Sequence, residues 1–176
     1  MATITLPTWV TLTRLLAVPI LLVGMERPGL FPVWIPLVVF LLAAATDWLD
    51  GWLARRLNQV SDLGKVLDPL VDKLMVLAPL MVLVAQQVVP AWAVFLILAR
   101  ELTIAGWRVN QPKISGASLW GKLKTVVQIA AIALLLPPLS PRLLPLGLGC
   151  FWVAVALTLI SGWTYLRPTK VVQGSD

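Results

Sequence analysis

Carboxylates gather in one short region of this otherwise apolar sequence. Four of the eight acidic residues lie in the two apolar spans of this region, Asp47 and Asp50 before a short polar connection and Asp68 and Asp72 after it. At about 100° per residue, steps of three or four residues return to the same face of a helix. Each pair of aspartates is therefore expected to line one stripe, and two antiparallel helices can turn these stripes toward each other.

Four clustered carboxylates repel one another unless a cation lies among them. The sequence contains no histidine and a single cysteine, Cys150, so a metal site here would consist of oxygen ligands. Such ligands suit Mg²⁺ or Mn²⁺, with Ca²⁺ as a further candidate. The alternative is that nearby basic side chains pair with the aspartates without a metal; these are Arg55, Lys65, Lys73 and Arg100.

Small residues accompany the aspartates. Gly51 and Ala54 share the face of the first pair, and Gly64 begins the stripe of the second pair. Small residues let membrane helices pack closely, and they also leave room for a bulky ligand. Arg55 adds a fork of hydrogen-bond donors that suits phosphate. Together these residues predict a site for a phosphoanhydride.

The surrounding chain must place this site in or against a membrane. Its 176 residues are 59% hydrophobic and 12% charged, whereas about 25% of a soluble domain is charged. We expect an all-α, polytopic membrane protein that forms a single domain over 1–176, with 166–176 as a flexible tail. Runs long enough to span a bilayer predict six helices near 9–25, 32–54, 64–87, 90–108, 121–138 and 143–165.

Basic residues are distributed unevenly between the two ends of these six spans. Twelve of the 14 lysines and arginines fall on the side that holds both termini and the aspartates, and only Arg27 and Arg142 fall on the other side. The positive-inside rule then predicts that both termini and the active site face the cytoplasm, in a multi-pass protein of the cytoplasmic (inner) membrane. This distribution does not predict nucleic-acid binding.

The aspartate region resembles the signature of the CDP-alcohol phosphatidyltransferase family. It reads Asp47-x2-Asp50-Gly51-x2-Ala54-Arg55-x8-Gly64-x3-Asp68-x3-Asp72, with eight fixed residues over 26 positions. The resemblance implies a six-helix membrane fold, usually a homodimer, that transfers a phosphatidyl group from a CDP-linked lipid to an alcohol. It also implies roles for the fixed residues. Asp47, Asp50, Asp68 and Asp72 would bind one or two divalent ions, Mg²⁺ or Mn²⁺, and Asp72 would act as the base. CDP-diacylglycerol would be bound by Asp47, Gly51, Ala54, Arg55, Gly64 and Asp68.

The acceptor alcohol is expected to carry a phosphate. Three stretches resemble family members that use glycerol 3-phosphate: LPTWVTLTRLL at 6–16, ARELTIAGWR at 99–108 and WGKLKTVVQIAAIALLL at 120–136. Basic residues on the same side would bind such an anion. The candidate acceptor-binding residues are Thr11, Arg14, Arg100, Arg108, Lys122 and Lys124. Two alternatives remain: attraction of these cations to anionic lipid head groups, and an ion pair between Arg100 and Glu101.

The predicted function is transfer of the phosphatidyl group of CDP-diacylglycerol to sn-glycerol 3-phosphate, with release of CMP, at the cytoplasmic face of the bilayer. One alternative is a different acceptor, such as inositol phosphate, inositol, serine or phosphatidylglycerol. Another is a divalent-cation transporter that uses the four aspartates. Transport would require polar residues on both sides of the membrane midplane, whereas the outer halves of the expected spans are almost wholly apolar. A non-catalytic scaffold would leave the signature unexplained.

Overall fold

A computed structural model describes residues 6–27, 29–57, 62–109, 119–136 and 141–166, and every regular element in these ranges is a helix. The elements are α1 (Leu6–Glu26), α2 (Ile35–Leu57), α3 (Asp62–Ala85), α4 (Ala91–Val109), α5 (Leu119–Leu135), the short 3-10 helix η1 (Pro141–Leu143) and α6 (Leu144–Leu166). The all-α prediction is confirmed, and each α-helix coincides with one expected span to within a few residues. The tail expected at 166–176 lies outside the described residues, except for its first residue.

Local backbone chemistry explains the sharp turn between α3 and α4. The Val88 N–H donates to the Leu83 carbonyl and the Gln87 N–H to the Val84 carbonyl, both at 2.9 Å. This pair of bonds is a Schellman cap, in which the residue after the helix adopts a left-handed conformation. Gln87 has that conformation, with φ of 60°. Pro90 then starts α4, because a proline needs no hydrogen-bond partner for its nitrogen at the beginning of a helix.

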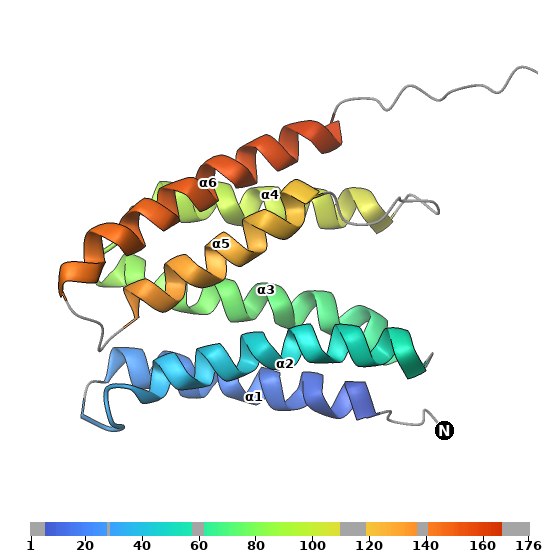
Figure 1. The fold of residues 1–176 in the computed structure, drawn as a ribbon, viewed down its shortest axis with the longest axis horizontal. Coiled ribbons are helices and arrows are strands. Elements are labelled where there is room, and N and C mark those ends of the chain that lie inside the picture. Colours follow the sequence, from blue (N-terminus) through green and yellow to red (C-terminus); the bar gives the residue numbers. More distant parts are fainter. Residues whose placement is uncertain (1–5, 28, 58–61, 110–118, 137–140, 167–176) are drawn as a thin grey trace, which may run out of the picture.

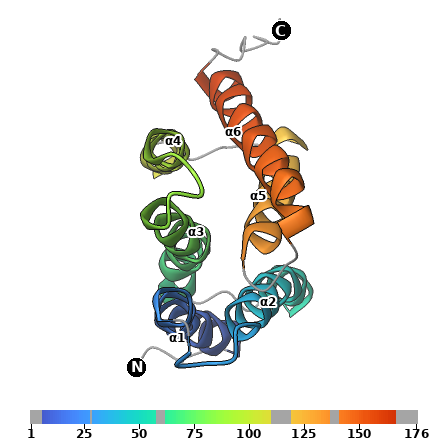
Figure 2. The same cartoon turned by 90° about the vertical axis from the view of Figure 1, so that its left-hand side faces the viewer.

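The six helices alternate in direction and form a bundle (Figure 1). The N-terminal ends of α1, α3 and α5 therefore lie at the same end of the bundle as the C-terminal ends of α2, α4 and α6. Seen along the bundle, α1, α3 and α4 lie on one side and α2, α5 and α6 on the other (Figure 2). α1 packs against both α2 and α3, whereas α2 and α3 contact each other only slightly. The two aspartate-bearing helices are thus joined mainly through α1.

Each helix contributes a large apolar side chain to the interior and another to the exterior. The fully buried set includes Leu21, Phe40, Leu83, Ile97, Ile132 and Phe151. The exposed set includes Leu16, Leu42, Met81, Phe95, Val126 and Trp163. A bundle that is apolar on its outside suits a lipid environment better than water. Within the described residues, one helical segment, Leu144–Trp163, is long and apolar enough by itself to cross a membrane.

The closest approach that a glycine permits between two helices occurs where α5 meets α6. A Cβ atom at Gly147 would lie 2.9 Å from Leu135 Cδ2 and 3.2 Å from Leu134 Cβ. A side chain there would require Leu135 to turn and Leu134 to move by a few tenths of an ångström. Gly147 therefore favours close packing of α5 and α6, the pair of helices with the most extensive contact in the described bundle.

Gly147→Val is expected to destabilise the bundle, because its side chain would push α5 away from α6. Overpacking of this kind costs about 1–3 kcal/mol, which thermal unfolding of the detergent-solubilised protein can measure. Gly149→Val is the matched control, since no atom lies within 4 Å of a Cβ at that position of the same helix. Equal losses in both variants would show that helix propensity, and not contact with α5, causes the effect.

Candidate active site

The four aspartates of the motif lie on continuous helices, two in α2 and two in α3. α2 ends and α3 begins at the same end of the bundle (Figure 1), so the backbone brings the two predicted stripes to one region. Asp72 is the member of the four whose side chain the structure describes. The side chains of the other predicted motif residues lie outside the described residues, and their roles stay predictions: Asp47, Asp50, Gly51, Ala54, Arg55, Gly64 and Asp68.

Asp72 of α3 is held by an arginine from α1. Arg14 Nη1 donates to Asp72 Oδ1 at 2.9 Å. The Arg14 side chain is 4% exposed and the Asp72 side chain 43%, so the arginine lies inside the bundle and the carboxylate reaches the surface. A charge-assisted hydrogen bond of this kind restricts the orientation of both groups. The contact therefore fixes the carboxylate while leaving it accessible to a ligand.

This contact changes the expectation for the N-terminal part of the proposed acceptor site. Arg14, predicted to bind the acceptor, contacts the predicted base, and its role toward the acceptor stays a prediction. Thr11 lies one turn earlier in α1 and is fully buried. Thr11 and Arg14 thus both belong to the packed interface between α1 and its neighbouring helices.

A second polar cluster joins α4, α5 and α6. Arg100 Nη1 donates to Glu101 Oε1 at 3.0 Å, and Lys124 Nζ contacts the same oxygen. Arg100 Nη2 donates to Ser161 Oγ at 3.0 Å. Side-chain exposures are 12% for Arg100, 18% for Glu101 and 7% for Lys124. The ion pair between Arg100 and Glu101, which the sequence left open as an alternative, is present, and the structure adds Lys124 and Ser161 to it.

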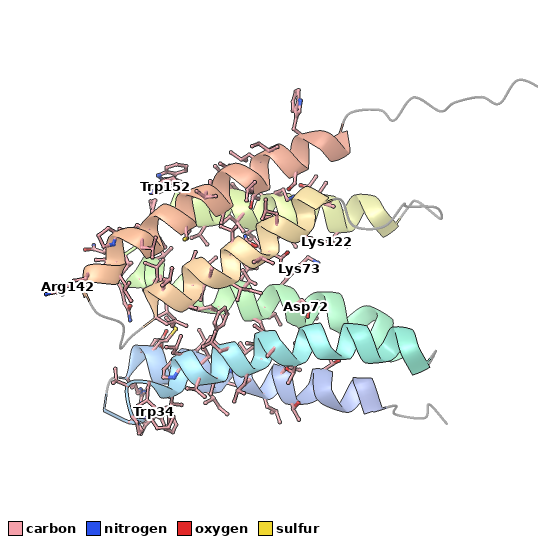
Figure 3. The ribbon with its side chains drawn as sticks, viewed as in Figure 1. Trp34, Asp72, Lys73, Lys122, Arg142 and Trp152 are labelled. Carbon is pink, nitrogen blue, oxygen red and sulfur yellow. The ribbon has the colours of Figure 1, made fainter. Side chains whose placement is uncertain are left out.

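The other basic candidates differ in position. Lys122 is exposed, because two residues along a helix turn a side chain to nearly the opposite face from Lys124. The Arg108 side chain lies outside the described residues, and its backbone forms part of the last turn of α4. Asp72, Lys73 and Lys122 lie in the same half of the bundle, far from Arg142 and Trp34 (Figure 3).

Two further residues of this region did not enter the predicted site. The sequence predicts Glu101 only as an alternative partner of Arg100, although an acidic residue within an apolar span is costly and is usually functional. Lys73 directly follows Asp72, is half-buried, and lies close enough to Lys124 for their charges to repel. Its position next to the motif aspartate was the available signal. Lys73 thus adds positive charge near Lys124, next in sequence to the Asp72 that Arg14 contacts.

The donor set suits a hard divalent cation. Asp72 provides a partly exposed carboxylate whose orientation is already fixed by Arg14, and the helical backbone brings three more aspartates to the same end of the bundle. Carboxylate oxygens are the ligands that Mg²⁺ and Mn²⁺ prefer. The arginine neutralises part of the charge and does not prevent the remaining carboxylates from binding a cation.

Known proteins are similar to this sequence over almost its full length. The family described as CDP-alcohol phosphatidyltransferase matches residues 4–160. The chain is 40% identical to the CDP-diacylglycerol--glycerol-3-phosphate 3-phosphatidyltransferase of Bacillus subtilis (strain 168), over 91% of this chain and 92% of that protein. It is 36% identical to the protein of the same name from Sodalis glossinidius (strain morsitans), over 94% of each chain. It is 37% identical to CDP-diacylglycerol--glycerol-3-phosphate 3-phosphatidyltransferase 2 of Arabidopsis thaliana, over 93% of this chain and 79% of that one.

The chain therefore belongs to the CDP-alcohol phosphatidyltransferase family, and the resemblance drawn from its aspartate motif is confirmed. The matched range contains the motif, the Arg14–Asp72 contact and three residues of the second cluster, Arg100, Glu101 and Lys124, and it ends one residue before Ser161. Members of the family are membrane-associated enzymes that generally use a divalent metal ion. The candidate site described above therefore belongs to a membrane-associated transferase.

Arg14→Gln is expected to lower the rate of CMP release about tenfold or more, because a hydrogen bond to a charged group contributes about 1.5–3 kcal/mol. Without the guanidinium, the Asp72 carboxylate would sample more orientations. CMP release by the purified protein measures the loss, and thermal unfolding separates it from a loss of fold. Arg27→Gln is the control, since Arg27 is exposed just beyond the opposite end of α1. Unchanged turnover in folded Arg14→Gln would contradict a role in orienting Asp72.

Proposed function

We propose that this protein transfers the phosphatidyl group of CDP-diacylglycerol to sn-glycerol 3-phosphate, giving phosphatidylglycerophosphate and CMP. Relatives whose names state this reaction align with more than nine-tenths of the chain. The observation that carries the choice of acceptor is the convergence of two cations, the buried Lys124 and the partly buried Arg100, beside the helix that holds Asp72. An acceptor with a phosphate needs such partners, whereas free inositol or serine does not.

Asp72 acts on the acceptor hydroxyl. It accepts the proton of the C1 hydroxyl as that oxygen bonds to the phosphorus of the phosphatidyl group, and the bond from this phosphorus to the CMP oxygen breaks. A general base of this kind contributes about 10²–10⁴-fold to a rate. Arg14 keeps Asp72 Oδ1 occupied at 2.9 Å, which lowers the freedom of the carboxylate and favours one direction of approach for the hydroxyl.

The ends of α2 and α3 bind the donor. Asp47, Asp50, Asp68 and Asp72 would hold one or two Mg²⁺ or Mn²⁺ ions, and a bound ion would neutralise charge on the pyrophosphate oxygens. Arg55 contributes a fork of donors to the same phosphates. Gly51, Ala54 and Gly64 leave room for the cytidine diphosphate group, with Asp47 and Asp68 at its edge. The proposal is supported by the shared helical end at which α2 finishes and α3 begins.

The acceptor phosphate binds between α4 and α5. Arg100 and Lys124 are its main partners, because burial strengthens their interaction with an anion. Arg108, at the last turn of α4, extends this pocket. Thr11, predicted as a further partner, lies on α1, which packs against α2 and α3. Lys122 is exposed and serves the acceptor at the entrance, where it also attracts anionic lipid head groups. Arg14 contributes through Asp72.

The protein spans the inner membrane six times, with the active site at its cytoplasmic face. The apolar exterior of all six helices supports this arrangement, as does the placement of Arg142 at the end of the bundle opposite Lys122 (Figure 3). An active site at the cytoplasmic face of the membrane can receive one substrate from the lipid and the other from water. Family resemblance supports a homodimer. A cation transporter accounts for the aspartates but not for membership of a transferase family.

An acceptor panel tests the function directly. Purified protein supplied with CDP-diacylglycerol and a divalent metal is expected to release CMP with sn-glycerol 3-phosphate and to remain nearly inactive with glycerol, inositol or serine. The phosphate of the first acceptor forms charge-assisted hydrogen bonds that the other three cannot form. Efficient turnover with inositol or serine would show that the family assignment is correct and that the proposed acceptor is wrong.

Metal removal tests the carboxylate site. Excess chelator is expected to abolish CMP release, and Mg²⁺ or Mn²⁺ to restore it, because four carboxylates need a cation to neutralise them at close range. Electron paramagnetic resonance can count bound Mn²⁺ independently of activity, and Asp47→Asn together with Asp68→Asn should reduce that count. Full activity in a metal-free preparation, or unchanged Mn²⁺ binding in the double variant, would contradict the assignment.

A further inference from the structure

Glu101 connects two basic side chains that approach it from different helices. Arg100 precedes it on α4, and Lys124 reaches it from α5. Both contact the same oxygen, Oε1, although a carboxylate offers two oxygens to its partners. This sharing brings a guanidinium and an ammonium group together, despite the repulsion between them. Glu101 is the described group that offsets this repulsion.

Arg100 divides its two terminal nitrogens between two partners. An arginine frequently binds one carboxylate with two parallel hydrogen bonds. Here Nη1 donates to Glu101 and Nη2 donates to Ser161, which is fully buried on α6. A Cβ atom at Gly162 would lie 3.2 Å from Arg100 Cγ, so the arginine stem lies against the α6 backbone. The guanidinium is thus oriented by two helices.

Lys124 retains capacity for a ligand. An ammonium group has three donors, and Glu101 accepts one of them from Lys124. Lys73 of α3 lies near enough to repel the Lys124 charge. Two cations, Arg100 and Lys124, therefore contact the carboxylate of Glu101, and Lys73 adds positive charge near Lys124. An anion that entered would relieve this repulsion, provided that the cations stay together.

We propose that Glu101 is a positioning residue for the acceptor: it draws Arg100 and Lys124 together so that both can bind one phosphate group. This inference rests on the proposed function, because it takes a phosphorylated alcohol as the acceptor. Glu101 does not touch the reacting atoms. It acts through its two basic neighbours, and Ser161 supports it by fixing the far side of the Arg100 guanidinium.

Glu101→Gln tests the role of the charge, since glutamine keeps the size and loses the charge that offsets the two cations. The KM for sn-glycerol 3-phosphate is expected to rise about tenfold or more, as for loss of a contact to a charged group. The KM for CDP-diacylglycerol should change by less than about twofold, since the donor is bound elsewhere. Ser161→Ala, a milder change, is expected to raise the acceptor KM by a smaller factor and provides a second variant if Glu101→Gln does not fold.

A double variant shows whether Glu101 acts through Lys124. If it does, Glu101→Gln combined with Lys124→Ala should raise the acceptor KM no further than Lys124→Ala alone, because effects that share one interaction are not additive. Gln128→Met is the matched control. Gln128 is buried one turn along α5 from Lys124, and its Nε2 has no partner among the described residues. Its replacement should leave the acceptor KM unchanged.

Three results would overturn the role of Glu101: an unchanged or lower acceptor KM in folded Glu101→Gln, equal increases in the KM of both substrates, or additive effects in the double variant. Failure of the proposed function has a different signature. In that case the unsubstituted protein would not use sn-glycerol 3-phosphate in the first place. Efficient use of this acceptor by the unsubstituted protein, with a selective increase in its KM in Glu101→Gln, would support both.

Discussion

Charged groups inside an apolar helix bundle must have partners, and this constraint organises the structure. Removing an ion from water costs several kcal/mol even after the surroundings relax. The buried cations Arg14 and Lys124 and the partly buried Arg100 all contact carboxylates, and in two of the three cases the carboxylate lies on another helix. The contacts tie α1 to α3 and α5 to α4. These ion pairs thus connect helices near the candidate active site, and apolar packing holds the rest of the bundle together.

α1 has a larger part in the site than its sequence suggests. The motif lies entirely in α2 and α3, yet these helices contact each other only slightly and pack mainly against α1. Arg14 of α1 orients the Asp72 carboxylate from the interior side. A catalytic carboxylate is most effective when its orientation is fixed before the substrate arrives. The first helix therefore acts as the support on which the two halves of the motif are assembled.

The bundle separates two environments that the reaction requires. Exposed apolar side chains on every helix suit the lipid-soluble donor of the proposed reaction, and the interior cations suit its anionic acceptor. Attraction between charges strengthens as water is excluded, so the proposed function uses both properties of the bundle.

The sequence by itself determined the helices and the chemistry of the motif. Apolar runs predicted the six helices because their length is set by the thickness of a bilayer, and eight fixed residues identified the family because few chains carry that spacing. The sequence did not determine which helix Arg14 would contact, or that Lys124 and Arg100 would contact the same carboxylate oxygen of Glu101. Residues 14 and 72 are 58 positions apart, and 101 and 124 are 23 apart. Such contacts depend on how helices pack and rotate about their axes, which spacing along the chain does not encode, so only the tertiary structure decided them.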